Sequence, residues 1–239
     1  MSDLTGDAEK SRQIKIALRA RLLTARRSLS DSARLAAATQ LQDQTLALVR
    51  RTRPRTMAAY VPVGSEPGGP DLPFLLAAEL PPDGRLLLPV LLPDNDLDWA
   101  VFTGTLTAAT RGLLEPTGPR LGPDALRTAD LALLPALAVS RDGTRMGRGG
   151  GSYDRALARL PLPAGTDPTA ATLLCTTPDS SPPTGTRPPA RSGPGPLIVA
   201  LLHDGEDVET VPAEPHDRRV QAVLTPSGGF SWRPLSDPL

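Results

Sequence analysis

A short stretch of the chain, "DGTRMGRGGGSYDRAL" from Asp142 to Leu157, concentrates residues that can bind an anion. It holds five glycines, three arginines and two aspartates within sixteen residues. Glycines let backbone N–H groups approach an anion without a Cβ in the way, and a helix that begins after them adds partial positive charge. Arg145 and Arg148 can add charge-assisted hydrogen bonds. The composition predicts a phosphate cradle, with a flexible glycine turn carrying solvated arginines as the alternative.

This stretch matches neither of two common nucleotide-binding motifs. A P-loop requires Gly-Lys-Ser/Thr, and the chain has no lysine after Lys15. The dinucleotide pattern GxGxxG, started at Gly147, requires a sixth-position glycine and meets Ser152. Tyr153 and Asp154 add a stacking surface and a carboxylate of the kind that holds Mg²⁺ together with phosphate oxygens. We therefore expect an anion site with a metal-binding carboxylate at its rim.

Two helices are predicted to precede the sheet. Residues 13–29 form an amphipathic pattern, in which the basic side chains of Lys15, Arg19 and Arg26 follow a stripe beside the apolar one. Ser30 or Asp31 can cap a second helix that runs to about residue 49. The pattern predicts an N-terminal helical hairpin. The basic stripe either faces solvent or reaches inward over the edge of the sheet. The apolar stripe consists of Ile14, Leu18, Leu22, Ala25 and Leu29.

The cradle must be positioned by buried strands. Residues 130–139 are almost entirely apolar and predict a strand that is buried on both faces of a mostly parallel sheet. Other strand-like runs alternate with helical ones, which favours a layered α/β fold with the sheet flanked by helices. Residues 161–196 contain ten prolines and four glycines, so we expect a flexible insertion within a single domain spanning residues 1–239.

Composition excludes several classes of protein. The 239 residues carry 26 basic and 26 acidic side chains, so no overall basic charge points to nucleic acid or to a membrane surface. A single cysteine excludes an intramolecular disulfide and a cysteine-based zinc cluster. No apolar run approaches the roughly 20 residues of a membrane span. We expect a soluble, cytoplasmic monomer that acts on a small molecule.

The motifs together resemble those of the 5-formyltetrahydrofolate cyclo-ligase family, also called methenyltetrahydrofolate synthetases. The signature is the loop "GTRMGRGGGSYDRAL", and three further segments agree with the family in order and spacing. These are "KIALR" at 15–19, "YVPVGSEPG" at 60–68 and "VPAEPHDRRVQAVLTPSG" at 211–228, and "GLLEP" at 112–116 is also typical.

The resemblance implies a reaction and a set of ligands. Family members convert 5-formyltetrahydrofolate to 5,10-methenyltetrahydrofolate with Mg-ATP and release ADP and phosphate, by attack of the formyl oxygen on the γ-phosphate followed by ring closure from N10. Their fold is similar to that of sugar-phosphate isomerases and CoA-transferases. By this similarity Glu66 and Val61 bind the folate, Asp154 and Asp217 bind Mg²⁺, and Arg148 and Tyr153 are catalytic. ATP would be held by Lys15, Arg19, Arg145, Gly147, Arg148, Gly149, Gly150, Gly151, Ser152 and Tyr153.

Other interpretations of the same residues stay open. Glu66 in a solvated turn and Val61 in ordinary strand packing need no ligand. The chain also has two His-Asp pairs, and only His216-Asp217 stands in the family context, whereas His203-Asp204 is expected in a turn. Relatives often have an aromatic residue at the position of Ser152. The rival functions are a sugar-phosphate isomerase or CoA-transferase-like enzyme, and a non-catalytic protein that binds a nucleotide or a folate.

Overall fold

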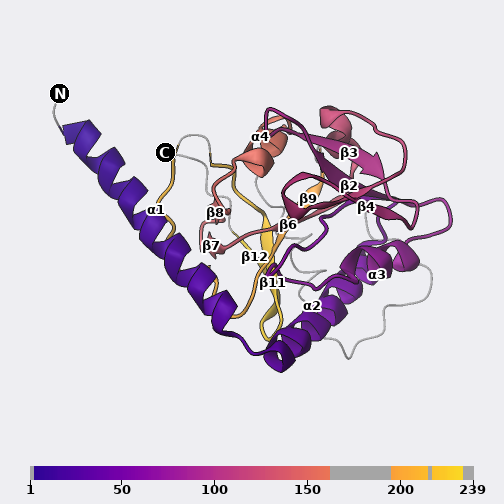
Figure 1. Cartoon of the computed structure of the whole chain (residues 1–239), viewed down its shortest axis with the longest axis horizontal. Helices are drawn as coiled ribbons and strands as arrows, with labels where there is room; N and C mark the ends of the chain where they lie inside the picture. The colour runs from indigo at the N-terminus through magenta and orange to yellow at the C-terminus, as the bar shows by residue number, and fades with distance from the viewer. Residues whose placement is uncertain (1–2, 162–194, 215–216, 234–239) are drawn as a thin grey trace.

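The computed structural model describes residues 3–161, 195–214 and 217–233 of the chain (Figure 1). The insertion predicted at 161–196 therefore lies outside the described residues except at its two ends, and so does His216 of the closing motif. Those two ends lie close together, because a Cβ built on Gly195 would lie 3.6 Å from Cγ of Pro161. The chain thus leaves the described structure and re-enters it at one place.

A seven-stranded sheet in the order β12-β11-β9-β6-β1-β2-β3 forms the centre of the molecule. Its five inner strands are parallel, and the two edge strands run antiparallel to their neighbours. The predicted mostly parallel sheet is confirmed. The strands are β1 (Thr56–Ala58), β2 (Arg85–Leu91), β3 (Leu97–Val101), β6 (Leu131–Pro135), β9 (Leu197–Leu201), β11 (Ala222–Thr225) and β12 (Gly229–Trp232).

Helices cover both faces of this sheet, because successive strand residues point to opposite sides. Leu131 and Leu133 of β6 pack in the same apolar cluster as residues of α2 (Asp31–Thr52) and α3 (Leu72–Glu79). Ala132 and Leu134 face the other cluster, which includes residues of α4 (Ser152–Ala158) and of the 3-10 helix η2 (Pro123–Thr128). The continuous apolar runs of the sequence follow from this covering of both faces.

The apolar run 130–139 is two strands, where the sequence analysis predicted one. β6 ends at Pro135, and β7 (Ala138–Ser140) belongs to a separate three-stranded sheet in the order β10-β7-β8. Nearly every residue on either side of the break is buried, so hydrophobicity does not mark the break. Pro135, which lacks an N–H for a further ladder bond, is the local signal. The remaining elements are β8 (Arg145–Met146), β10 (Asp207–Val208), the pair β4 (Leu106–Ala108) and β5 (Leu114–Pro116), and the 3-10 turn η1 (Thr110–Gly112).

The first two helices follow one another as predicted, but they diverge. α1 (Asp3–Ser28) extends along one side of the molecule, and α2 turns away from it under the sheet (Figure 1). The Ser30 hydroxyl caps α2 by accepting a hydrogen bond from Ala33 N at 3.2 Å, as one of the two caps considered from the sequence. The pair is therefore a wide V in place of a closely packed hairpin.

The buried face of α1 is its basic stripe. Lys15 and Arg26 are only 5% and 3% exposed, whereas Ile14, from the predicted apolar stripe, is 56% exposed. Among residues 9–28 of the helix, whose side chains the structure describes, Leu22 is the only apolar one that is buried, in a small cluster with Leu137 and neighbouring side chains. Of the two interpretations of the basic stripe, the inward-facing one is correct.

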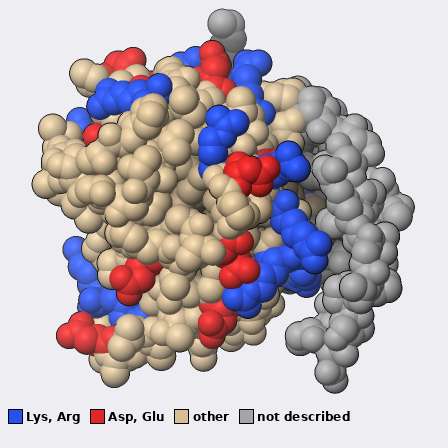
Figure 2. Space-filling view, turned by 90° about the vertical axis from the view of Figure 1, so that its right-hand side faces the viewer, with Lys and Arg blue, Asp and Glu red and all other residues tan. Residues whose placement is uncertain are grey.

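Charged residues of both signs are interspersed on the face that Figure 2 shows, which lies on the side of α3 and β4. No helix in the described ranges combines the length and the apolar character needed to cross a bilayer.

Candidate functional site

A cavity of about 460 Å³ lies at the carboxyl ends of the parallel strands β1, β2 and β6. β1 lies between β2 and β6, so the chain moves outward in opposite directions from it, and a crevice at such a switch point is the usual ligand site of a parallel α/β sheet. All the site residues predicted from the sequence line this cavity. They are Lys15, Arg19, Val61, Glu66, Arg145, Gly147, Arg148, Gly149, Gly150, Gly151, Ser152, Tyr153, Asp154 and Asp217.

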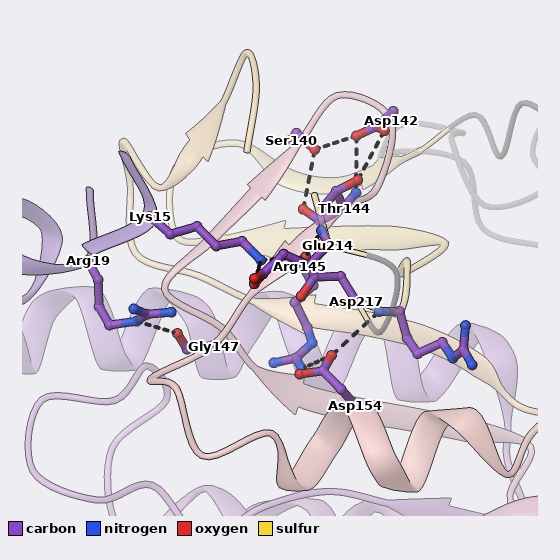
Figure 3. Close-up of polar contacts among 11 residues, drawn as sticks. Lys15, Arg19, Ser140, Asp142, Thr144, Arg145, Gly147, Asp154, Glu214 and Asp217 are labelled. Atoms are coloured by element: carbon purple, nitrogen blue, oxygen red, sulfur yellow. Dashed lines mark hydrogen bonds and ion pairs between the residues drawn. The ribbon is translucent and has the colours of Figure 1, made fainter. Parts of the chain in front are cut away.

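Helix α1 supplies cations to the cavity wall, and two of them, Lys15 and Arg19, are drawn in Figure 3. Lys15 Nζ lies 2.7 Å from Glu214 Oε2 and 2.6 Å from Asp217 Oδ2, so it neutralises two carboxylates of the closing motif. Arg19 Nε donates to Gly147 O at 3.2 Å. Within the described ranges no carboxylate forms an ion pair with Arg19, which leaves its charge available to an anion.

The glycines of the loop make room for guanidinium groups. A Cβ on Gly147 would meet Arg145 Nη1 at 3.0 Å, and a Cβ on Gly149 would lie 3.7 Å from Arg19 Cζ. Gly149 and Gly151 also have φ of 106° and 68°, in a region that other residues rarely adopt. Helix α4 begins at Ser152 directly after the loop, so its first amides, which lack intrahelical acceptors, belong to residues of the cavity wall.

The start of the signature orders the turn that leads into β8. The carboxylate of Asp142 accepts hydrogen bonds from the hydroxyl groups of Ser140 and Thr144 and from Thr144 N (Figure 3). Burial alone would raise the pKa of Asp142, but these hydrogen bonds outweigh it and lower the pKa. A Cβ on Gly143 would lie 2.5 Å from Val220 O, so only glycine fits there. The turn thereby fixes the direction in which Arg145 leaves the strand.

The two predicted metal ligands lie on the cavity wall and are held by cations. Arg145 Nη2 lies 2.7 Å from Asp154 Oδ1, and Lys15 Nζ holds Asp217 (Figure 3). The amide of Arg218, which follows Asp217, approaches Asp154 Oδ1 at 3.5 Å, so the two segments are adjacent. The described residues contain no group of three or more His, Cys, Asp or Glu side chains that could hold a metal ion. The two carboxylates are donors of the type that Mg²⁺ takes together with phosphate oxygens and water, and each is paired with a cation in this structure.

The residues predicted to bind the folate line the cavity from the segment that follows β1. Glu66 is held by its own turn, because Oε2 accepts from Val63 N at 3.0 Å, while Oε1 lies 3.4 Å from Arg148 Nη1. The Tyr60 hydroxyl donates to Pro67 O at 2.7 Å and fixes the other side of this turn. The Glu66 carboxylate is therefore positioned at the wall by backbone contacts.

Tyr153 also lines the cavity and contacts Arg145, whose guanidinium lies 5.8 Å from the ring centroid. Burial raises the pKa of Tyr153 well above its usual value, and the Glu66 carboxylate raises it further. The phenol is thus neutral at physiological pH, which suits stacking and hydrogen bonding better than proton abstraction.

Sequence reasoning missed several residues that line the same cavity. Arg26 belongs to the basic stripe of α1, and Glu214 belongs to the closing motif. The stripe and the motif could therefore have identified both residues as candidates. Tyr60 begins the second motif and Glu115 stands in "GLLEP". Arg111 has no such signal, because it reaches the cavity from the turn between β4 and β5.

His203 is buried in the turn after β9, where a turn was expected. Its Nε2 lies 3.1 Å from Ser65 O, and Nδ1 has no partner among the described residues. Burial lowers the pKa of His203, so the ring is neutral and Nε2 carries the proton that it donates to Ser65 O. The charged groups near the ring are Glu206, Asp204 and Arg26.

Comparisons with known sequences agree with these motifs. The profile of the 5-formyltetrahydrofolate cyclo-ligase family matches residues 11–178. The chain is 37% identical over 222 residues to the 5-formyltetrahydrofolate cyclo-ligase of Mycolicibacterium smegmatis, which covers 90% of this chain and 95% of that protein. It is 35% identical over 101 residues to the mitochondrial 5-formyltetrahydrofolate cyclo-ligase of Arabidopsis thaliana, over 41% of this chain and 28% of that protein.

Two solved structures share the fold. The 5,10-methenyltetrahydrofolate synthetase of Aquifex aeolicus superposes with a TM-score of 0.64 at 22% identity, over 95% of each chain. That of Mycoplasma pneumoniae superposes with a TM-score of 0.58 at 17% identity, over 89% of this chain and 99% of the other.

Proposed function

Because the chain belongs to the 5-formyltetrahydrofolate cyclo-ligase family, we propose that it cyclises 5-formyltetrahydrofolate to 5,10-methenyltetrahydrofolate with Mg-ATP. The products are then ADP and phosphate. The observation that carries this proposal is the single cavity in which the glycine loop, the cations of α1 and the carboxylate of Glu66 meet.

The nucleotide side of the cavity suits a triphosphate. Arg19 lies against Gly149 and carries a charge that no described carboxylate neutralises, while Lys15 and Arg145 lie beside it. Such groups act on phosphoryl transfer by positioning and by neutralising charge. We assign the triphosphate to this wall, with Arg148 near the reacting group because its half-exposed side chain extends from the glycine loop to Glu66, 3.4 Å away.

The folate side suits a pterin. A carboxylate is the natural acceptor for the amino and ring N–H groups of a pterin, and Glu66 is held at the wall by Val63 N. Tyr153 offers an aromatic surface between Glu66 and Arg145. In this arrangement the formyl oxygen meets the γ-phosphate between the walls, and N10 then closes onto the activated carbon as phosphate leaves.

Asp154 and Asp217 would hold Mg²⁺. When bound, the ion would neutralise the phosphate oxygens and fix their orientation. The chain's part is to hold both carboxylates in place, through Arg145 and Lys15, until the phosphates arrive. Both cations then remain at the wall, where they can turn toward the phosphate oxygens.

The proposal is tested by mixing the protein with Mg-ATP and 5-formyltetrahydrofolate and following the absorbance of the methenyl product. We expect product formation that requires both ATP and Mg²⁺. The variant Asp154→Asn should lose most of its turnover and need more Mg²⁺ for half-maximal rate. Asp96→Asn is the matched control, because Asp96 is also a buried partner of an arginine, Arg159, but does not line the cavity. A folded protein that binds ATP yet forms no product would refute the proposal.

A further inference from the structure

Glu206 is a buried carboxylate outside the cavity lining that joins two parts of the site. It is 3% exposed and lies in the turn between β9 and β10. Oε1 accepts from Arg26 Nε at 2.6 Å, and Oε2 accepts from Arg26 Nη2 at 2.8 Å and from His203 N at 2.8 Å. One side chain thus binds a residue of α1 and the backbone of the turn after β9.

On one side this link holds α1. Arg26 also donates to Ala136 O, at the end of β6, so its guanidinium is hydrogen-bonded both to Glu206 and to the backbone after β6. Helix α1 extends along the side of the molecule (Figure 1), and its buried contacts are the small cluster of Leu22 and the polar contacts of Lys15, Arg19 and Arg26. Because these three cations share one face of α1, the contacts that fix Arg26 also determine where Lys15 and Arg19 enter the cavity.

On the other side the link holds the turn that carries Glu66. The backbone of His203 is bonded to Glu206, and its ring donates to Ser65 O at 3.1 Å. Ser65 directly precedes Glu66, whose carboxylate faces the cavity. Removal of the ring donor would leave Ser65 O without this partner and would free the turn on that side.

We propose that Glu206 is a positioning residue that fixes the phosphate-binding cations of α1 and the folate-binding turn at Glu66 in one geometry, through Arg26 and His203. This rests on the proposed function, since it assigns ATP to the α1 side and folate to the Glu66 side. It predicts a separation of effects that a general loss of stability does not produce: Arg26 acts on one substrate, His203 on the other, and Glu206 on both.

The test compares KM for ATP and KM for 5-formyltetrahydrofolate in four variants. Arg26→Lys keeps the charge but loses the two-pronged contact, and should raise KM for ATP by about fivefold or more with little change in KM for folate. His203→Phe should do the reverse, and His203→Gln, which keeps an N–H donor, should restore KM for folate. Glu206→Gln should raise both values by about fivefold or more.

Glu79→Gln is the matched control. Glu79 forms the same two-pronged contact with Arg50, at 2.9 and 2.8 Å, but this contact joins α3 to α2 and neither residue lines the cavity. It should leave both KM values unchanged. If Glu206→Gln does not fold, the opposite effects of Arg26→Lys and His203→Phe decide.

Equilibrium binding of each ligand to the wild-type protein, with a non-hydrolysable ATP analogue, separates the two proposals. If the wild type binds both ligands but forms no product, the proposed function fails and the same separation is read from dissociation constants. If the wild type is active and Glu206→Gln matches Glu79→Gln, the positioning role is refuted. Equal rises of both constants in Arg26→Lys and in His203→Phe also refute it, because they indicate general loosening.

Discussion

The replacement Arg19→Gln directly tests whether the wall formed by α1 and the glycine loop binds the triphosphate of ATP. The side chain lies against Gly149 and donates to Gly147 O, and its charge has no carboxylate partner in the described part of the chain. Its loss therefore strands no buried acid. We expect a large effect on ATP binding and a small effect on stability. Most other cations of the cavity are paired with carboxylates, so that their replacement would affect both quantities.

The expected size of the effect follows from the contacts. A charge-assisted hydrogen bond contributes about 1.5–3 kcal/mol, and every 1.4 kcal/mol is about a factor of ten in affinity. Because Arg19 is half-buried, we take the lower part of this range, which corresponds to a rise of about 10- to 40-fold in the dissociation constant for ATP. The lost bond to Gly147 O should lower the free energy of unfolding by only about 1 kcal/mol.

Isothermal titration with a non-hydrolysable ATP analogue and Mg²⁺ measures the first quantity, and urea unfolding measures the second. Arg27→Gln is the matched control, since Arg27 lies on the same helix and its Nε also donates to a backbone carbonyl, Leu23 O, at 3.2 Å, but it faces away from the cavity. Equal ATP affinity in the two variants would refute the assignment of the triphosphate to this wall.

Three further predictions concern other parts of the site. In Gly149→Ala the alanine must adopt φ near 106°, so we expect a loss of about 1–3 kcal/mol in the free energy of unfolding together with weaker ATP binding. The control Gly104→Ala places alanine at φ of 87° on an exposed turn, and it should lose stability but bind ATP normally. Lys15→Gln leaves two carboxylates without their shared cation and should cost about 3 kcal/mol in urea unfolding, at the low end for a buried pair because Glu214 keeps 31% of its side chain exposed; an unchanged unfolding midpoint would contradict this. Burial lowers the pKa of His203 below the value of about 6.5 that it has in the unfolded chain, so its contribution to stability is complete above that pH and is lost as the pH falls through the folded pKa. The unfolding free energy of His203→Gln should therefore depend less on pH between about 6.5 and 5 than that of the wild type.

The parallel sheet and the glycine loop could be predicted because their signals are local. A continuous run of apolar residues directly predicts a strand that is buried on both faces. The glycines of residues 147–151 predict a loop that binds an anion, because so many glycines in one short segment have few other uses. The motif residues were then found together around one cavity. Their ligands stay predictions, because geometry alone does not identify what they bind.

Other features depend on partners that are distant in the sequence. The buried face of α1 could not be predicted from hydrophobicity. Arg26 is buried because its charge is paired with Glu206, which lies 180 positions away in the sequence. The break between β6 and β7 depends on which sheet each half joins, and both halves are equally apolar. Periodicity carries no information on either choice.

The closeness of Pro161 and Gly195 has a consequence for how this protein can be altered in the laboratory. Because the chain leaves and re-enters the described structure at two closely spaced points, a change in the length of the intervening segment alters only the size of a closed loop. The entropic cost of such a loop grows with the logarithm of its length, so a doubling costs roughly 0.6 kcal/mol. We therefore expect that a reporter domain or an affinity tag grafted between these two points would leave the catalytic architecture undisturbed.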